Sequence, residues 1–226
     1  IIFISKSYFE LINQDPNKKI IYKIKSNLID NFIFRFIWLH FILPFELKIL
    51  GVKILFSSLN YCPILIRLFD IKSILFIHPM FDCGDSRVED YGMNNAVGRI
   101  TDTIIALSRI IYSGHVQRYK NARIVVGMGG AALPYIIGRL MHNYNLHKDT
   151  LFNPKWALSN MYYDTVLHDQ LSLNFLIDRV GYERVMLGSD MPFPIGDFEP
   201  LKILSDLDKT KTLSITSKTT KDLFGL

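Results

Sequence analysis

The sequence is poor in the residues that mark several common classes of protein. Its 226 residues include two cysteines, Cys62 and Cys83, and their separation fits no metal-binding or redox motif. Thiols are the rule in a reducing compartment, and no targeting pattern is present, so we expect a cytoplasmic protein. The net charge of +5 is not gathered into a basic stripe with interleaved aromatic residues, and zinc-finger and RNA-binding motifs are absent. A nucleic-acid partner is therefore not expected.

Long hydrophobic runs are lacking as well. The most apolar early run, from Phe32 to Phe45, is interrupted by Arg35 and His40 and is closed by Pro44. At about 14 residues it is shorter than the roughly 20 that are needed to span a bilayer. It also lies too far along the chain for a signal peptide. We expect a buried helix here, with His40 as a core residue, and no membrane partner.

Glycine is missing from the first 48 residues, which are dominated by Ile, Asn, Lys and Phe. From Gly51 onward the composition becomes varied and is punctuated by turn-forming residues. Over the whole chain 49% of residues are hydrophobic and 21% are charged, as in a globular protein. We predict an atypical N-terminal segment at residues 1–48 and one larger domain at residues 49–226.

Short apolar runs rich in β-branched and aromatic residues recur after Gly51, as expected for strands that are buried on both faces. The predicted strands are Val52–Phe56, Ile74–Ile77, Ile124–Val126, Met161–Tyr163 and Val185–Leu187. Helices are predicted at Thr101–Lys120, Leu133–His147, Asp169–Val180 and Pro200–Leu207. Strands that alternate with helices indicate parallel β/α units, so the predicted fold class is α/β.

Polar residues directly follow several of these strands. His78 comes after the second predicted strand, and Asp190 comes after the last one. In parallel β/α units the chemistry concentrates at the C-terminal ends of the strands. A histidine and an aspartate can both bind a metal, but a catalytic zinc site requires three protein ligands and a water. The residues alone leave two interpretations open: part of a metal site, or strand-end side chains bonded to loop backbone.

A set of motifs follows in order over residues 76–226. They are Phe76–Pro79, Gly129–Pro134, Ile137–Arg139, Asn153–Lys155, Tyr163–Asp164 with His168–Asp169, Leu187–Gly196 and Leu223–Leu226. In order and spacing this segment resembles the aminocarboxymuconate-semialdehyde decarboxylase branch of the amidohydrolase superfamily. The Pro-Phe-Pro sequence after Asp190 favours this branch over related aromatic-acid decarboxylases.

The resemblance implies a (β/α)8 barrel of the TIM type with one divalent metal, usually zinc. In the family the ligands are a His-x-His pair after the first strand, a histidine after the fifth and an aspartate after the eighth. His78 and Asp190 match the last two ligands. Arg139 matches an arginine that reaches the substrate carboxylate of a neighbouring subunit, which implies a homodimer; the alternative is a solvated helix arginine. Phe193 is a candidate for substrate binding, with a packing role as the alternative.

Two departures from the family pattern bear on activity. Met128 stands where the family has its catalytic histidine, and a thioether neither takes nor gives a proton. No two histidines are separated by a single residue, so the His-x-His pair is missing.

The first 48 residues are too few for three further β/α units of about 30 residues each. We therefore predict an incomplete barrel in which strands four to eight are recognisable.

The predicted function is that of a metal-dependent decarboxylase, a carboxy-lyase of tryptophan or aromatic degradation, with its activity reduced or lost. Its expected partner is a small-molecule carboxylate substrate. Three alternatives stay open: a related hydrolase, an inactive homologue that binds an intact paralogue, and a remnant that folds poorly. Metal content and co-purification with a full-length homologue distinguish these possibilities.

Overall fold

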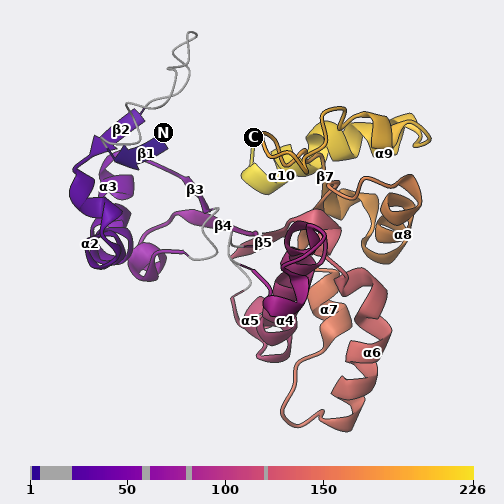
Figure 1. Ribbon diagram of the computed structural model, residues 1–226. Coiled ribbons are helices and arrows are strands. Elements are labelled where there is room, and N and C mark those ends of the chain that lie inside the picture. The colour runs from indigo at the N-terminus through magenta and orange to yellow at the C-terminus, as the bar shows by residue number, and fades with distance from the viewer. Residues whose placement is uncertain (1, 6–21, 58–61, 80–82, 120–121) are drawn as a thin grey trace. The chain divides into compact units, whose positions relative to one another are not determined.

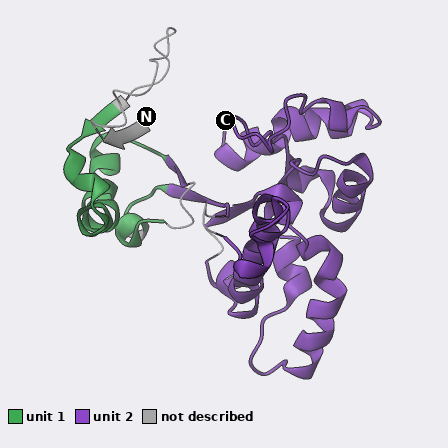
Figure 2. Cartoon of the chain, in the orientation of Figure 1, with its two compact units in different colours: residues 1–53, 62–71 green, residues 54–61, 72–226 purple. Residues whose placement is uncertain are grey.

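The computed structural model describes residues 2–5, 22–57, 62–79, 83–119 and 122–226. The chain divides into two compact units, one of residues 1–53 with 62–71 and one of residues 54–61 with 72–226 (Figure 2). Within the described ranges no helix has the length and apolar character needed to cross a membrane.

The larger unit is built on a parallel sheet whose strands follow one another in chain order (Figure 1). The strands are β3 (Ile54–Ser57), β4 (Lys72–Ile77), β5 (Arg123–Val126), β6 (Tyr162–Asp164) and β7 (Val185–Met186). In register, Ile54 pairs with Lys72, and Ile74 pairs with Arg123. Each predicted strand is present, and its bounds differ from the prediction by at most two residues. The predicted α/β class and the parallel β/α units are therefore confirmed.

Helices connect these strands. They are α4 (Arg99–Tyr112), α5 (His115–Arg118), α6 (Leu133–Leu146), α7 (Pro154–Leu158) and α8 (Gln170–Val180), and the C-terminal region adds α9 (Lys209–Leu213) and α10 (Thr219–Phe224). Shorter helical turns are η4 (Ser86–Val88), η5 (Asn94–Gly98), η6 (Met128–Gly130), η7 (Tyr182–Arg184), η8 (Lys202–Leu204) and η9 (Ser214–Lys218).

Two of the helix predictions need correction. The helix expected over Thr101–Lys120 is divided into α4 and α5 at Gly114, whose φ of 75° ends the first helix. A side chain at Gly114 would also collide with the ring of Phe152, at 2.5 Å. The helix expected over Pro200–Leu207 is reduced to the single turn η8.

Both faces of the sheet are apolar, but they pack differently. Along β4, Leu75 and Ile77 face the helices, whereas Ile74 and Phe76 face the opposite side. The outer-face cluster joins the strands to α4, α6 and α8 and includes Leu107, Ile111, Val126, Leu133, Tyr163, Leu173, Leu176 and Val185. The inner-face cluster consists of Ile74, Val125 and Leu223, with Ile54, Phe76, Tyr162, Met186 and Phe224 partly buried against it. Residues of α10 thus cover part of the inner face.

The smaller unit contains a pair of parallel strands, β1 (Ile2–Ser5) and β2 (Tyr22–Lys25), which the sequence pattern did not predict. Its helical elements are η1 (Asn27–Asp30), α2 (Phe32–Ile37), η2 (Trp38–Ile42), α3 (Leu43–Ile49) and η3 (Ile64–Leu68). The helix predicted over Phe32–Phe45 is confirmed, since α2, η2 and α3 follow one another without a break.

Burial in that helical run is narrower than expected. Leu39, Leu43 and Leu47 are buried, whereas Phe32 remains 71% exposed. His40 is buried as predicted, and its Nδ1 accepts a hydrogen bond from the backbone N–H of Ile64 at 3.2 Å. Burial lowers the pKa of His40 because the charged imidazolium loses its hydration.

Candidate metal and substrate site

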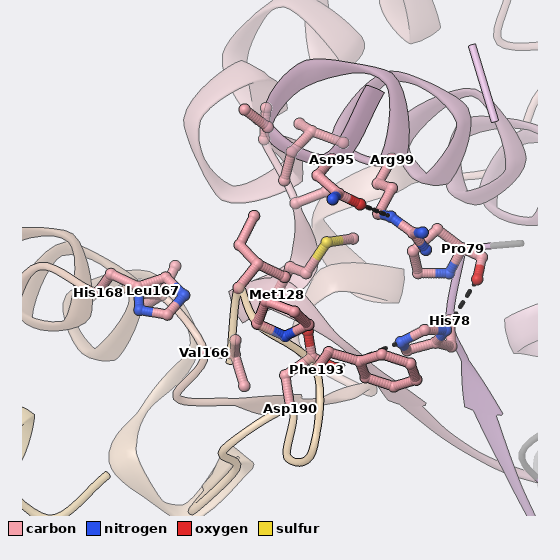
Figure 3. Close-up of a pocket in the computed structure, with 16 residues that line it drawn as sticks. His78, Pro79, Asn95, Arg99, Met128, Val166, Leu167, His168, Asp190 and Phe193 are labelled. Carbon is pink, nitrogen blue, oxygen red and sulfur yellow. Dashed lines mark hydrogen bonds and ion pairs between the residues drawn. The ribbon is translucent and has the colours of Figure 1, made fainter. Parts of the chain in front are cut away.

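His78, Met128 and Asp190, which the sequence analysis selected, lie at one edge of the larger unit's sheet (Figure 3). His78 follows β4, Met128 follows β5, Asp164 ends β6 and Asp190 lies just beyond β7. The strands run parallel and in chain order, so their C-terminal ends lie side by side. This topology brings residues that are far apart in the sequence to a single site.

His78 and Asp190 face one another at this edge. The Nε2 atom of His78 lies 3.7 Å from Oδ1 of Asp190, and the two side chains are 32% and 22% exposed. Nδ1 of His78 lies 2.8 Å from the backbone carbonyl of Pro79. A carbonyl only accepts, so Nδ1 carries the proton and donates it there. The ring of Phe76 stacks near the imidazole, with ring centroids 6.1 Å apart, and helps to hold its plane.

The geometry of this pair suits two ligands of one divalent metal ion. A separation of 3.7 Å is too long for a hydrogen bond. Two atoms that each lie about 2 Å from a metal are at most about 4 Å apart. A ligating histidine commonly donates its other ring N–H to a carbonyl, as Nδ1 of His78 does. Two donors do not make a full site, however, and no cluster of three or more such donors occurs among the residues that the structure describes.

The loop after β7 is folded back on Asp190. Phe193 donates its backbone N–H to the carbonyl of Asp190 at 3.1 Å, and Gly196 donates to the carbonyl of Phe193 at 2.8 Å. A Cβ atom at Gly196 would lie 2.6 Å from the backbone oxygen of Asp190, so this turn requires glycine. The tight turn brings Phe193 onto the wall of the cavity beside Asp190.

Asp164 is a buried carboxylate that anchors the turn after β5. It accepts hydrogen bonds from the backbone N–H groups of Gly129 at 2.8 Å and of Val166 at 3.2 Å. Burial raises the pKa of Asp164 to about 6; the backbone hydrogen bonds oppose this rise, and the negative charge of Asp190 adds to it. Met128, at the start of the anchored turn, has a φ of 54°, which a side-chain-bearing residue adopts only when its surroundings impose it.

A cavity of about 450 Å³ opens beside these groups. Its polar lining residues are His78, Asn95, Arg99, His168 and Asp190. Met128 and Phe193 also line it. Arg139 lies elsewhere, exposed on α6, and is not brought together with the pair.

Sequence reasoning missed Asn95 and Arg99. They lie on η5 and at the start of α4, where no strand end marks them. The sequence signal for them was weak, because it consisted of two polar residues, Asn95 and Arg99, that are four positions apart near the start of a helix.

Comparisons with known proteins identify the family of this chain. The sequence profile of the family described as Amidohydrolase matches residues 49–226, which is most of the chain. This chain belongs to the amidohydrolase family. The predicted membership of the amidohydrolase superfamily is therefore confirmed.

Among curated amidohydrolase relatives, the 2-amino-3-carboxymuconate-6-semialdehyde decarboxylase of Dictyostelium discoideum is 31% identical over 153 residues, which cover 66% of this chain and 42% of that protein. The counterpart in Caenorhabditis elegans is 28% identical over 143 residues, which cover 61% of this chain and 36% of that protein. The chain thus spans less than half the length of these curated relatives.

Solved structures show the same amidohydrolase fold. The 5-carboxyvanillate decarboxylase of Sphingomonas paucimobilis aligns with a TM-score of 0.65 and 20% identity, over 81% of this chain and 62% of that one. The 5-carboxyvanillate decarboxylase of Novosphingobium aromaticivorans aligns with a TM-score of 0.57 and 20% identity, over 73% of this chain and 51% of that one. That structure is a complex with manganese and 4-hydroxy-3-methoxy-5-nitrobenzoic acid.

Proposed function

We propose that this amidohydrolase chain carries part of the site of a metal-dependent decarboxylase that acts on an unsaturated or aromatic carboxylate. The first substrate to test is 2-amino-3-carboxymuconate-6-semialdehyde, named in its curated relatives. The observation that carries the proposal is the His78–Asp190 pair, 3.7 Å apart, beside a largely apolar cavity. The thiols of Cys62 and Cys83 support a reducing compartment such as the cytosol.

His78 Nε2 and an oxygen of Asp190 would hold the metal, with zinc as the first candidate and manganese as the second. A divalent ion bound there would polarise an oxygen of water or substrate. Further ligands must come from outside the described residues. The hydrogen bond from His78 Nδ1 to Pro79 fixes the ring. Met128 and Phe193 give the cavity apolar walls that exclude water from the reacting carbon.

In the reaction, the bond between the substrate carbon and its carboxylate breaks, carbon dioxide leaves, and the carbon takes up a proton. Met128 cannot supply that proton, because a thioether has no exchangeable hydrogen. Loss of a positioned acid or base typically lowers a rate by about 10²–10⁴-fold. We therefore expect slow turnover from this chain alone, and a gain in rate for Met128→His in the presence of metal.

The test is a calorimetric titration of the metal-stripped chain with Zn²⁺ and with Mn²⁺. His78→Ala and Asp190→Asn should each weaken binding by about tenfold or more, since each removes one ligand. His142→Ala is the matched control, because His142 is exposed on α6. Equal metal affinity in His78→Ala and the unmodified chain would exclude this pair as the site. Carbon dioxide release from the carboxymuconate semialdehyde then tests the reaction itself.

A second candidate function is favoured by the position of Arg139. Its exposed location on α6 suits an arginine that serves the site of a second subunit, either another copy or a paralogue. Tagged chain should then co-purify with a second copy or with a full-length homologue, and Arg139→Gln should lower the partner's affinity for carboxylate substrate. A chain that remains monomeric in sedimentation and captures no homologue contradicts this role.

A further inference from the structure

Arg99 places a guanidinium in a cavity whose walls are otherwise largely apolar. The apolar lining includes Ile100, Met128, Val166, Leu167, Phe193 and Ile195. Arg99 is the first residue of α4 and is partly buried. In Figure 3 its side chain extends from α4 toward Pro79 and His78. Among the described residues that line the cavity, it carries the only guanidinium.

Asn95 holds this guanidinium in place. Nε of Arg99 donates a hydrogen bond to Oδ1 of Asn95 at 2.7 Å, from one turn earlier in η5 (Figure 3). This contact engages Nε, the N–H that joins the guanidinium to its aliphatic stem. Because the side chain is oriented before any ligand arrives, less rotamer entropy is lost on binding.

The backbone beneath these two residues is also anchored. The side-chain amide of Asn94 donates to the carbonyl of Cys83 in the preceding loop. The backbone N–H of Gly84 donates to the carboxylate of Asp102 on α4 at 2.9 Å. These bonds tie the start of α4 to the chain that follows His78. Arg99 and the His78–Asp190 pair are therefore presented to the cavity by connected elements.

We propose that Arg99, positioned by Asn95, binds a carboxylate of the substrate and selects anionic over neutral ligands. This role rests on the proposed decarboxylation for its place in a reaction, but not for the binding itself. A guanidinium matches a carboxylate with parallel N–H···O bonds, and such a pair gains strength where water is partly excluded. Arg139 is exposed on α6, so Arg99 supplies a cation to this cavity from its own chain.

The experiment measures binding without turnover. The full chain, stripped of metal and then reloaded with Mn²⁺, is titrated with 4-hydroxy-3-methoxy-5-nitrobenzoate and separately with the corresponding amide, which keeps the phenol and lacks the carboxylate. We expect Arg99→Gln to raise the Kd for the carboxylate by about tenfold or more and to leave the Kd for the amide unchanged. Arg99→Lys should lie between, because it keeps the charge without the planar fork. Arg109→Gln, exposed near the other end of α4, should match the unmodified chain.

Asn95 is tested as a positioning residue. Asn95→Ala should weaken carboxylate binding by several-fold and leave amide binding intact, whereas Asn95→Gln should keep more of the carboxylate binding because it retains an uncharged amide oxygen as acceptor. Equal weakening of both probes by Arg99→Gln and by Arg99→Lys overturns carboxylate recognition, as does an unmodified chain that binds neither probe.

Failure of the two proposals gives different results. If no carbon dioxide is released but Arg99→Gln still loses only the carboxylate probe, the decarboxylation fails and the binding role of Arg99 holds. If carbon dioxide is released and Arg99→Gln keeps the same KM and the same Kd, the decarboxylation holds and the role of Arg99 fails.

Discussion

The outer and inner faces of the five-stranded sheet differ in how completely they are packed. On the outer face, Tyr163 and Leu173 belong to a large cluster closed by helices, and both are 0% exposed. Among the described residues of the inner face, the fully buried cluster consists of Ile74, Val125 and Leu223, beside a cavity that reaches the strand ends. The difference separates two tasks: the outer face stabilises the fold, and the inner face leaves room for polar groups and a ligand.

The largest expected effect is on the free energy of unfolding, when a leucine on each face is replaced by alanine. Leu173→Ala removes a fully buried side chain from the outer-face cluster and should cost about 4 kcal/mol of unfolding free energy. Leu223→Ala on the inner face should cost roughly 2 kcal/mol, because neighbours can relax into the adjacent cavity. Urea denaturation monitored by circular dichroism measures both. Equal losses would show that the two faces are packed to the same degree.

The next effect concerns pH and the buried carboxylate of the inner face. The pKa of Asp164 is raised to about 6, so the folded chain favours the protonated acid. Its contribution to stability is then complete below the unfolded pKa near 3.8 and is lost as the pH rises through 6. Across that window the unmodified chain should lose roughly 3 kcal/mol relative to Asp164→Asn, measured without metal. A constant difference between the two proteins from pH 4 to 7 contradicts the raised pKa.

The contrast between the faces also shows what the sequence could predict. The strands were found because runs such as Ile74–Ile77 are apolar on both faces, and this pattern is local. The meeting of His78 and Asp190 followed from parallel topology alone, since the C-terminal ends of neighbouring strands share one edge. Their roles as metal ligands stay predictions.

Features that depend on non-local packing could not be predicted. Arg99 reaches the cavity because η5 and α4 are tied to the loop after β4, and no periodic pattern encodes that tie. The contribution of Leu223 to the inner face depends on how α10 returns to the sheet. The strands β1 and β2 were missed because four-residue alternations such as Tyr22–Lys25 are too short to stand out in a segment rich in Lys and Asn.

A smaller effect compares two glycines of the inner face. A Cβ atom at Gly188 would lie 2.8 Å from Cβ of Asp164, whereas at Gly127 the nearest atom would be 3.5 Å away, on the ring of Phe76. Gly188→Ala should therefore cost roughly 2 kcal/mol through overpacking. Gly127→Ala should change stability by less than about 0.5 kcal/mol. Thermal unfolding of both variants tests the spacing of the β5 and β7 ends around Asp164, and a harmless Gly188→Ala would contradict it.

The smallest expected effect distinguishes backbone strain from steric clash. It compares a glycine on an outer helix with a glycine beside the inner face. A Cβ atom would meet nothing within 4 Å at Gly138 in α6 or at Gly225 after α10. Gly138 lies inside a helix, so Gly138→Ala should stabilise the chain by about 0.5–1 kcal/mol by reducing the entropy of the unfolded state. Gly225 has a φ of 70° as the C-cap of α10, so Gly225→Ala should destabilise by about 1 kcal/mol. Opposite shifts in urea midpoint confirm that α10 ends at a left-handed cap; shifts of the same sign would mean that α10, and with it the cover of the inner face, ends differently.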